Sequence, residues 1–175
     1  MTSKINFGGV EVALINRPWT RVSERLPYRK TYRLKPGDNW HDAEITHDQW
    51  EHYVKSDEGP IPVGAMIVRE LLQEGAMTAV FTECWGRGCV FMGGDLVCVE
   101  KSGELGDLLD QLRIANGNRW RGLPDVIALF PDGRVAIREA KVSGKDRVSQ
   151  TQHEFSKLAR CVLGDRLDLA VVEWG

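Results

Sequence analysis

Residues 122–141, which read GLPDVIALFPDGRVAIREAK, decide the fold of this chain. Two apolar runs stand on either side of the turn-forming sequence Phe130-Pro-Asp-Gly133. Proline in the second position of a turn and glycine in the fourth favour a type I turn followed by a glycine bulge. The stretch therefore predicts a hairpin of two antiparallel strands, residues 125–130 and 134–142, joined by a three-residue loop.

The turn also fixes which residues face one another. A three-residue loop pairs Phe130 with Arg134, so counting back along both strands places Asp125 opposite Glu139. Because side chains alternate between the faces of a strand, these two carboxylates and Lys141 share a face with the apolar residues nearer the turn, which are Ile127, Leu129, Val135 and Ile137. A two-residue loop would shift the register by one residue and separate the carboxylates, but the proline favours the longer loop.

Two carboxylates and a lysine at one end of a hairpin can carry hydrolytic chemistry. Carboxylate oxygens suit Mg²⁺ or Mn²⁺, which proteins usually hold with one or two carboxylates together with a substrate phosphate. Such a metal polarises a phosphodiester and helps to ionise a water, and the Lys141 ammonium would orient that water or offset the developing charge. The alternative is a set of ion pairs, Asp with Lys and Glu with Arg, on an exposed strand end.

The order of these residues resembles a known signature. Pro124-Asp125 followed by Glu139-Ala-Lys141 is similar to the motif of the PD-(D/E)XK nuclease superfamily. The surrounding sequences resemble its VRR-NUC branch more specifically, and they are Gly122-Leu-Pro-Asp-Val, Arg138-Glu-Ala-Lys-Val, Lys145-Asp-Arg-Val-Ser and Gln152 at the start of a helix. The resemblance covers about residues 58–175, whereas residues 1–57 have no recognised counterpart.

The resemblance implies a restriction-endonuclease-like αβββαβ core, an α/β (α+β) fold in which helices flank a central mixed sheet. It implies that Asp125, Glu139 and the backbone carbonyl of Ala140 bind the metal, with Lys141 as the catalytic lysine. The first helix of the family commonly supplies a further glutamate, and Glu70 is the best match. Independently, Glu70 lies on the apolar side of its helix, where a carboxylate must be paired, solvated or bound to a metal.

Other candidate residues surround this centre. Gln152, in the first turn of the penultimate helix, would face the same pocket. Basic side chains in flanking loops would hold phosphates, and they are Arg119, Arg121, Lys145 and Arg147. A second basic segment, residues 17–35, interleaves aromatic residues with Arg21, Arg25 and Arg29. That pattern suits phosphate contact with base stacking, or else a surface that balances the acidic stretch after it.

The chain divides near residue 58. We expect residues 1–57 to be an irregular, polar N-terminal extension, basic then acidic, with a short helix from residue 46 to about Lys55. Residues 58–175 form the nuclease-like domain, with helices over residues 63–74, 104–115 and 149–162. Its strands are expected over residues 77–85, 89–100, 125–130, 134–142 and 167–174.

The composition is that of an ordinary globular protein. The chain has 175 residues, 27% of them charged and 42% hydrophobic, with a formal net charge of −2. These values exclude disorder and a histone-like attraction of the whole protein to nucleic acid, but they leave room for a local basic groove. Apolar runs are far shorter than the ~18 residues of a membrane span, and no secretion signal is recognised. We therefore expect a cytoplasmic protein with no membrane contact.

The cysteines agree with a reducing compartment. None of them forms a CxxC pair, which disfavours structural zinc. We expect small buried side chains at all four positions, Cys84, Cys89, Cys98 and Cys161.

The function expected from residues and resemblance together is a metal-dependent DNA endonuclease. Small stand-alone members of the family act on branched DNA, such as junctions or flaps, as homodimers, which points to DNA repair or recombination. One alternative is a catalytically inactive module that binds nucleic acid or a partner protein, although the presence of Asp125, Glu139 and Lys141 argues against it. The other alternative is cleavage of RNA or nucleotides, and only the family analogy favours DNA over these substrates.

Overall fold

The computed structural model describes residues 3–22, 28–32, 41–45, 53–57, 59–84, 87–92, 95–98 and 103–175. Side chains are described over residues 3–22, 53–57, 59–82 and 103–175. The helices are α1 (Val63–Gln73), α2 (Gly103–Ala115) and α3 (Gln150–Leu163), the last followed by a short 3-10 turn (Gly164–Arg166).

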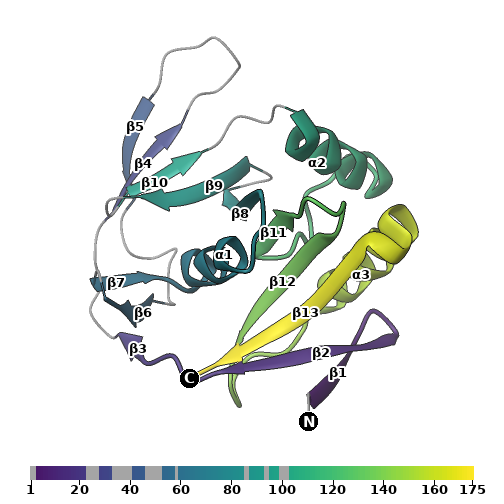
Figure 1. Ribbon diagram of the computed structural model, residues 1–175, viewed down its shortest axis with the longest axis horizontal. Helices are drawn as coiled ribbons and strands as arrows, with labels where there is room; N and C mark the ends of the chain where they lie inside the picture. Colours follow the sequence, from purple (N-terminus) through teal and green to yellow (C-terminus); the bar gives the residue numbers. More distant parts are fainter. Residues whose placement is uncertain are drawn as a thin grey trace.

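The strands form one large mixed sheet and one small sheet (Figure 1). The large sheet has ten strands in the order β1-β2-β13-β12-β11-β8-β9-β10-β4-β5, and the small sheet has the order β3-β6-β7. In chain order the strands are β1 (Ser3–Phe7), β2 (Val10–Arg17), β3 (Arg21–Val22), β4 (Tyr28–Tyr32), β5 (His41–Ile45), β6 (Tyr53–Ser56), β7 (Gly59–Pro62), β8 (Thr78–Cys84), β9 (Arg87–Met92), β10 (Asp95–Cys98), β11 (Val126–Leu129), β12 (Val135–Val142) and β13 (Leu167–Trp174).

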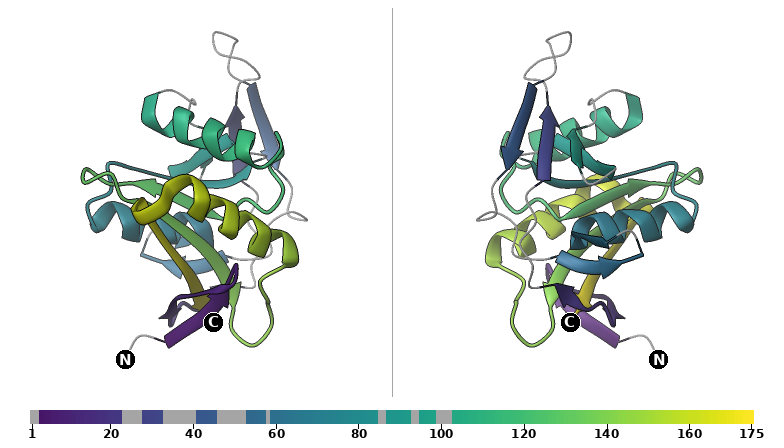
Figure 2. Two further views of the ribbon diagram at one scale, coloured as in Figure 1. Left: turned by 90° about the vertical axis from the view of Figure 1, so that its right-hand side faces the viewer. Right: turned by 90° about the vertical axis from the view of Figure 1, so that its left-hand side faces the viewer.

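The predicted fold class, a central mixed sheet flanked by helices, is confirmed. Strand β11 pairs antiparallel with both β8 and β12, whereas β12 and β13 run parallel. The order α1, β8, β11, β12, α3, β13 is αβββαβ, with β9, β10 and α2 inserted after β8. The two side views show helices on both sides of the sheet (Figure 2).

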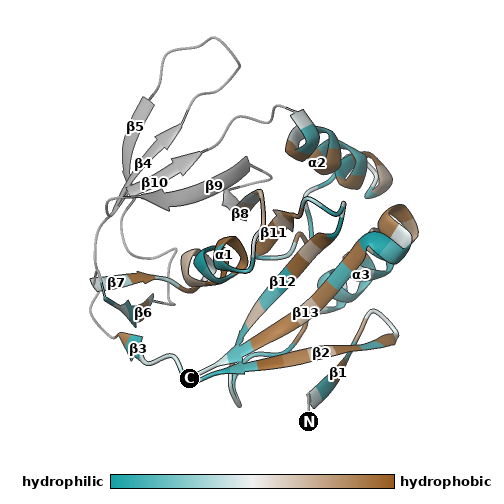
Figure 3. Cartoon of the chain, in the orientation of Figure 1, coloured by the Kyte–Doolittle hydropathy of each residue, from teal (hydrophilic) through white to brown (hydrophobic). Residues whose placement is uncertain are grey.

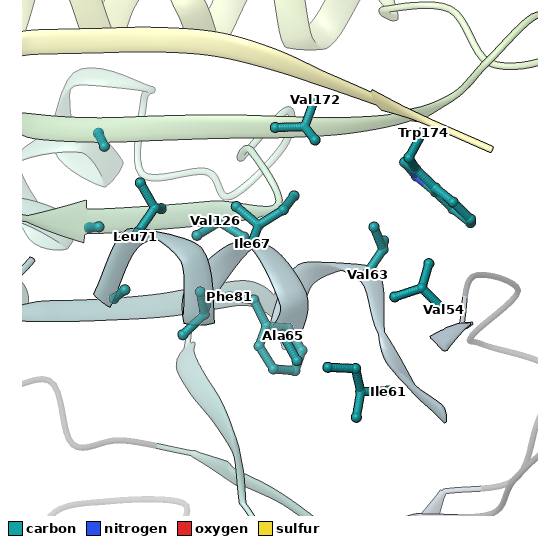
Figure 4. Packing of buried hydrophobic residues seen from close by; sticks show 14 of the residues in the cluster. Val54, Ile61, Val63, Ala65, Ile67, Leu71, Phe81, Val126, Val172 and Trp174 are labelled. Atoms are coloured by element: carbon teal, nitrogen blue, oxygen red, sulfur yellow. The ribbon is translucent and has the colours of Figure 1, made fainter. Parts of the chain in front are cut away.

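Alternating side chains of the sheet build two hydrophobic cores. On one face, α1 contributes Ile67 and Leu71, which pack in one cluster with Val126 and Val172 (Figure 4). On the other face, α2 and α3 cover Ile127, Leu129, Val135 and Ile137. Strands covered on both faces should be apolar throughout, and Figure 3 shows β13 and β2 to be largely hydrophobic.

The central hairpin has the predicted register. Val126 pairs with Arg138 and Leu129 with Val135, so the next residues along are Asp125 and Glu139. At the turn, the Gly133 N–H donates to the Phe130 carbonyl, 3.0 Å, and the Phe130 N–H donates to the Arg134 carbonyl, 3.0 Å. Gly133 has φ +84°, the left-handed conformation of a glycine bulge. The three-residue loop therefore holds, and with it the shared face of the two carboxylates.

The expectation of an irregular N-terminus is wrong for the described residues 3–17. Strands β1 and β2 form a hairpin in which Phe7 pairs with Val10, and β2 then pairs in parallel with β13 inside the main sheet. Gly8 and Gly9, both with positive φ, make the two-residue turn. Two glycines between apolar residues are a hairpin signal, so the sequence contained the information.

Three smaller expectations also differ from the structure. Residues 53–56 form strand β6, not the end of a helix, because they pair with β7 beside α1. The single strand expected over residues 89–100 is divided into β9 and β10, which pair with each other. Cys161 is exposed rather than buried, because it lies on the outer side of α3. Among the described residues, no helix is long and apolar enough to cross a membrane.

Candidate active site

The end of the central hairpin brings Asp125, Glu139 and Lys141 together. The Lys141 Nζ lies 2.7 Å from Glu139 Oε1, and the Ala140 N–H donates to Asp125 Oδ2 at 2.7 Å. Asp125 immediately precedes β11, whereas the other two lie in β12 on the face covered by α2 and α3. The register of the hairpin, in which Val126 pairs with Arg138, places Asp125 beside Glu139.

Glu139 is a buried carboxylate, with 1% of its surface exposed. Burial raises the pKa of its carboxyl well above the usual value, and the neighbouring Asp125 carboxylate raises it further, while Lys141 acts in the opposite direction. Oε1 is within reach of both Lys141 and Gln152. Oε2 has no hydrogen-bond partner in the described part of the chain. A buried carboxylate oxygen without a partner is costly unless a cation or a proton completes it.

Gln152 is held in place by its own helix. Ser149 caps α3: its hydroxyl accepts from the Gln152 N–H, 3.3 Å, and the Gln152 Oε1 accepts from the Ser149 N–H, 2.8 Å. This capping box leaves the Gln152 Nε2 to donate to Glu139 Oε1. The neighbouring Gln150 points elsewhere and donates to Glu154.

The donor set fits a hard divalent cation. The unpartnered Glu139 Oε2 and the adjacent Asp125 carboxylate are oxygen ligands of the kind that Mg²⁺ and Mn²⁺ take. Within the described residues, no three His, Cys, Asp or Glu side chains gather into a metal-binding group. Two carboxylates with water and substrate phosphate are nevertheless the usual protein contribution to a Mg²⁺ site.

The structure does not bring Glu70 to this site. Glu70 lies in α1, which covers the opposite face of the sheet. Both of its carboxylate oxygens accept a hydrogen bond from Arg17 Nε, at 2.8 and 2.9 Å. The sequence left three possibilities for this carboxylate, namely pairing, solvation or metal binding, and the structure shows an ion pair. The sequence does not reveal this partner, because Arg17 comes near α1 only through the pairing of β2 with β13. Ala140 contributes its N–H to the site, in the bond to Asp125.

The four basic loop residues lie in the two connections that adjoin site residues in the sequence. Arg119 and Arg121 lie in the connection that leads to Asp125, and Lys145 and Arg147 in the connection from β12 to α3. All four are exposed, and within the described residues their side chains have no partner. Asn116 fixes the first connection, because its side-chain amide donates to the carbonyls of both arginines at 2.9 Å.

The N-terminal basic candidates are only partly visible. Arg21 is exposed in β3. Arg25 lies outside the described residues, and Arg29 is in β4, where only the backbone is described.

The sequence interpretation missed Thr82, which holds the strand end that carries Asp125. Thr82 is buried in β8, its N–H donates to the Asp125 carbonyl at 2.8 Å, and its hydroxyl donates to the Pro124 carbonyl. Thr82 directly follows the apolar residues 79–81 of β8, but its partner depends on the pairing of β8 with β11.

Comparison of the chain with models of known protein families, with curated proteins and with solved structures finds no match.

Proposed function

We propose that this chain is a Mg²⁺- or Mn²⁺-dependent endonuclease that hydrolyses phosphodiester bonds in DNA. The observation that carries the proposal is the buried Glu139 carboxylate, whose Oε2 lacks a partner while the Asp125 carboxylate and the Lys141 ammonium lie beside it. The resemblance of the same residues to the PD-(D/E)XK signature supports the same chemistry.

Each residue has a role that follows from its contacts. Asp125 and Glu139 would hold the cation, which when bound polarises the scissile phosphate and lowers the pKa of a water. Lys141, fixed against Glu139 Oε1 at 2.7 Å, keeps a positive charge where the transition state gains negative charge. Gln152 donates to the same oxygen and so holds Glu139 in one orientation.

The surroundings favour a phosphate-rich substrate. Arg119, Arg121, Lys145 and Arg147 are exposed on the two connections that border the site, where they would contact the backbone of the substrate. The choice of DNA, of branched forms such as junctions or flaps, and of a homodimer rests on the family resemblance.

One observation favours a second candidate. Glu139 has 1% of its surface exposed and is ion-paired with Lys141, as expected of a structural ion pair in a nuclease-like fold that binds nucleic acid or protein without cutting. The two functions differ in their response to metal. A cation bound by the folded state alone must raise the melting temperature.

The test is a cleavage panel of single-stranded, duplex, flap and four-way-junction DNA, and of duplex RNA, each with Mg²⁺, Mn²⁺ or a chelator. We expect metal-dependent cleavage of DNA, strongest on a branched form, and a rise in melting temperature with Mn²⁺. Asp125→Ala should remove both effects. The matched control is Asp107→Ala, since Asp107 is an exposed carboxylate on α2 away from the site. Absence of metal stabilisation and of cleavage would favour the binding module.

A further inference from the structure

Gly122 touches the first turn of α3 with its bare backbone. Its φ is +76°, in the left-handed region that favours glycine. A Cβ on Gly122 would overlap the Thr151 carbonyl oxygen, and would lie 2.7 Å from the Thr151 carbonyl carbon and 3.3 Å from the Gln152 nitrogen. These neighbours are helix backbone, which cannot rotate away as a flexible side chain would.

This contact joins two segments that carry site residues. On one side is the connection that ends in Asp125, which Thr82 holds from β8 through the Pro124 and Asp125 carbonyls. On the other side is the helix turn that carries Gln152, whose side chain donates to Glu139. Gly122 therefore lies where the spacing between the Asp125 segment and the Gln152 segment is set.

We propose that Gly122 is a positioning residue for the metal site, a role that rests on the proposed function. Direct contact of its backbone with Thr151 sets how near the first turn of α3 comes to the hairpin. That distance decides whether the Gln152 amide reaches Glu139 Oε1 while its own oxygen stays in the capping box. A Cβ would push the helix turn and the Asp125 connection apart, and a functional site tolerates displacements of only about 0.5 Å.

The test compares Gly122→Ala with two glycines that share its backbone conformation and lack its contact. Gly117, in the same connection, has φ +66°, and Gly75, after α1, has φ +99°. A Cβ at either position would meet nothing within 4 Å. Alanine there carries the backbone strain alone. We expect Gly122→Ala to weaken Mn²⁺ affinity, measured by calorimetry, about tenfold or more, and both controls to stay within about twofold of wild type.

A double-mutant cycle tests whether Gly122 acts through Gln152. If both residues hold Glu139 by one route, the combined variant Gly122→Ala with Gln152→Ala should lose little more Mn²⁺ affinity than Gln152→Ala alone. If the two losses multiply, Gly122 acts by another route and the proposal fails. It also fails if Gly122→Ala matches Gly117→Ala, or if it does not fold while Gly117→Ala does, since Gly122 would then serve the fold.

Hydrogen exchange of the metal-free protein separates this proposal from the proposed function. The Ser149 amide donates to Gln152 Oε1, and the Ala140 amide donates to Asp125 Oδ2. We expect both amides to exchange faster in Gly122→Ala than in Gly117→Ala. Unchanged exchange would overturn the positioning role. A wild-type protein that binds no metal would overturn the function, and the exchange comparison would still decide the role of Gly122.

Discussion

Gln152 donates its side-chain amide to the buried Glu139 carboxylate while its side-chain oxygen accepts from the N-cap backbone of its own helix. One side chain thus takes part in the N-terminal cap of α3 and orients a candidate metal ligand. Because both the nitrogen and the oxygen of this amide are hydrogen-bonded, loss of one bond should weaken the other.

The first prediction concerns this double role. Gln152→Ala should lower the free energy of unfolding by about 1 kcal/mol through loss of the cap and should weaken Mn²⁺ affinity about tenfold. Urea denaturation and calorimetry measure the two effects. Gln150→Ala is the control, since the Gln150 side chain donates to the exposed Glu154 and not to Glu139. Equal behaviour of the two variants would remove Gln152 from the site.

The second prediction concerns the catalytic assignment. Asp125→Ala and Lys141→Ala should each reduce single-turnover cleavage at saturating Mg²⁺ to background, because each removes a charge at the reacting phosphate. Binding of the same DNA should change by less than about threefold, since phosphate contacts elsewhere supply most of the affinity. A wild-type cleavage rate in either variant would refute the role of that residue.

Glu70 should behave differently. Its carboxylate is occupied by Arg17 on the other face of the sheet, so Glu70→Gln should keep the cleavage rate within about twofold of wild type. The cost to stability should be about 1 kcal/mol or less, because both side chains are partly exposed. A Glu70→Gln protein that folds and fails to cleave would show that Glu70 reaches the metal after all.

A pH-dependent prediction concerns Asp168. Burial acts to raise the pKa of its carboxyl, but hydrogen bonds and charge from Arg138 and Arg134 outweigh burial and lower the pKa below 3.8. A lowered pKa in the folded state contributes stability above pH 3.8 that is lost as the pH falls through the folded-state pKa. Asp168→Asn should therefore cost about 3 kcal/mol at neutral pH, where it leaves the buried Arg138 without its carboxylate partner.

The measurement for Asp168 is urea denaturation from pH 7 down to pH 3. The difference between wild type and Asp168→Asn should shrink toward the acid end. Asp132→Asn provides the comparison, because Asp132 is an exposed carboxylate 4.0 Å from Arg134. A difference that stays constant over the whole range would contradict the assigned pKa shift.

The last prediction concerns the basic residues. Replacing Arg119 and Arg121 by alanine should flatten the slope of log affinity against log salt by about 0.9 for each lost phosphate contact on duplex DNA. The triple variant of Arg21, Arg25 and Arg29 tests the N-terminal segment in the same assay. Whichever set leaves the slope unchanged does not contact phosphate.

The hairpin could be predicted because its information is local. Phe130-Pro-Asp-Gly133 sets the turn, the turn sets the register, and the register sets Asp125 beside Glu139. The partner of Glu70 could not be predicted, because Arg17 arrives through strand pairing between distant parts of the chain. Gln152 was placed near the site by resemblance alone, since nothing local to α3 reveals that its first turn meets Glu139.

The parallel pairing of β2 with β13 has a consequence for the order of folding. Ala13 lies beside Ala170, so the inner edge of β2 has no neighbour in the sheet until β13 has been synthesised. The β1–β2 hairpin can form early, but β2 can pair with β13 only after almost the whole chain has been made. Pairing of strands so far apart in the sequence slows folding. During that interval β2 presents an open strand edge, and a ribosome that stalls before residue 167 leaves this edge available to other chains.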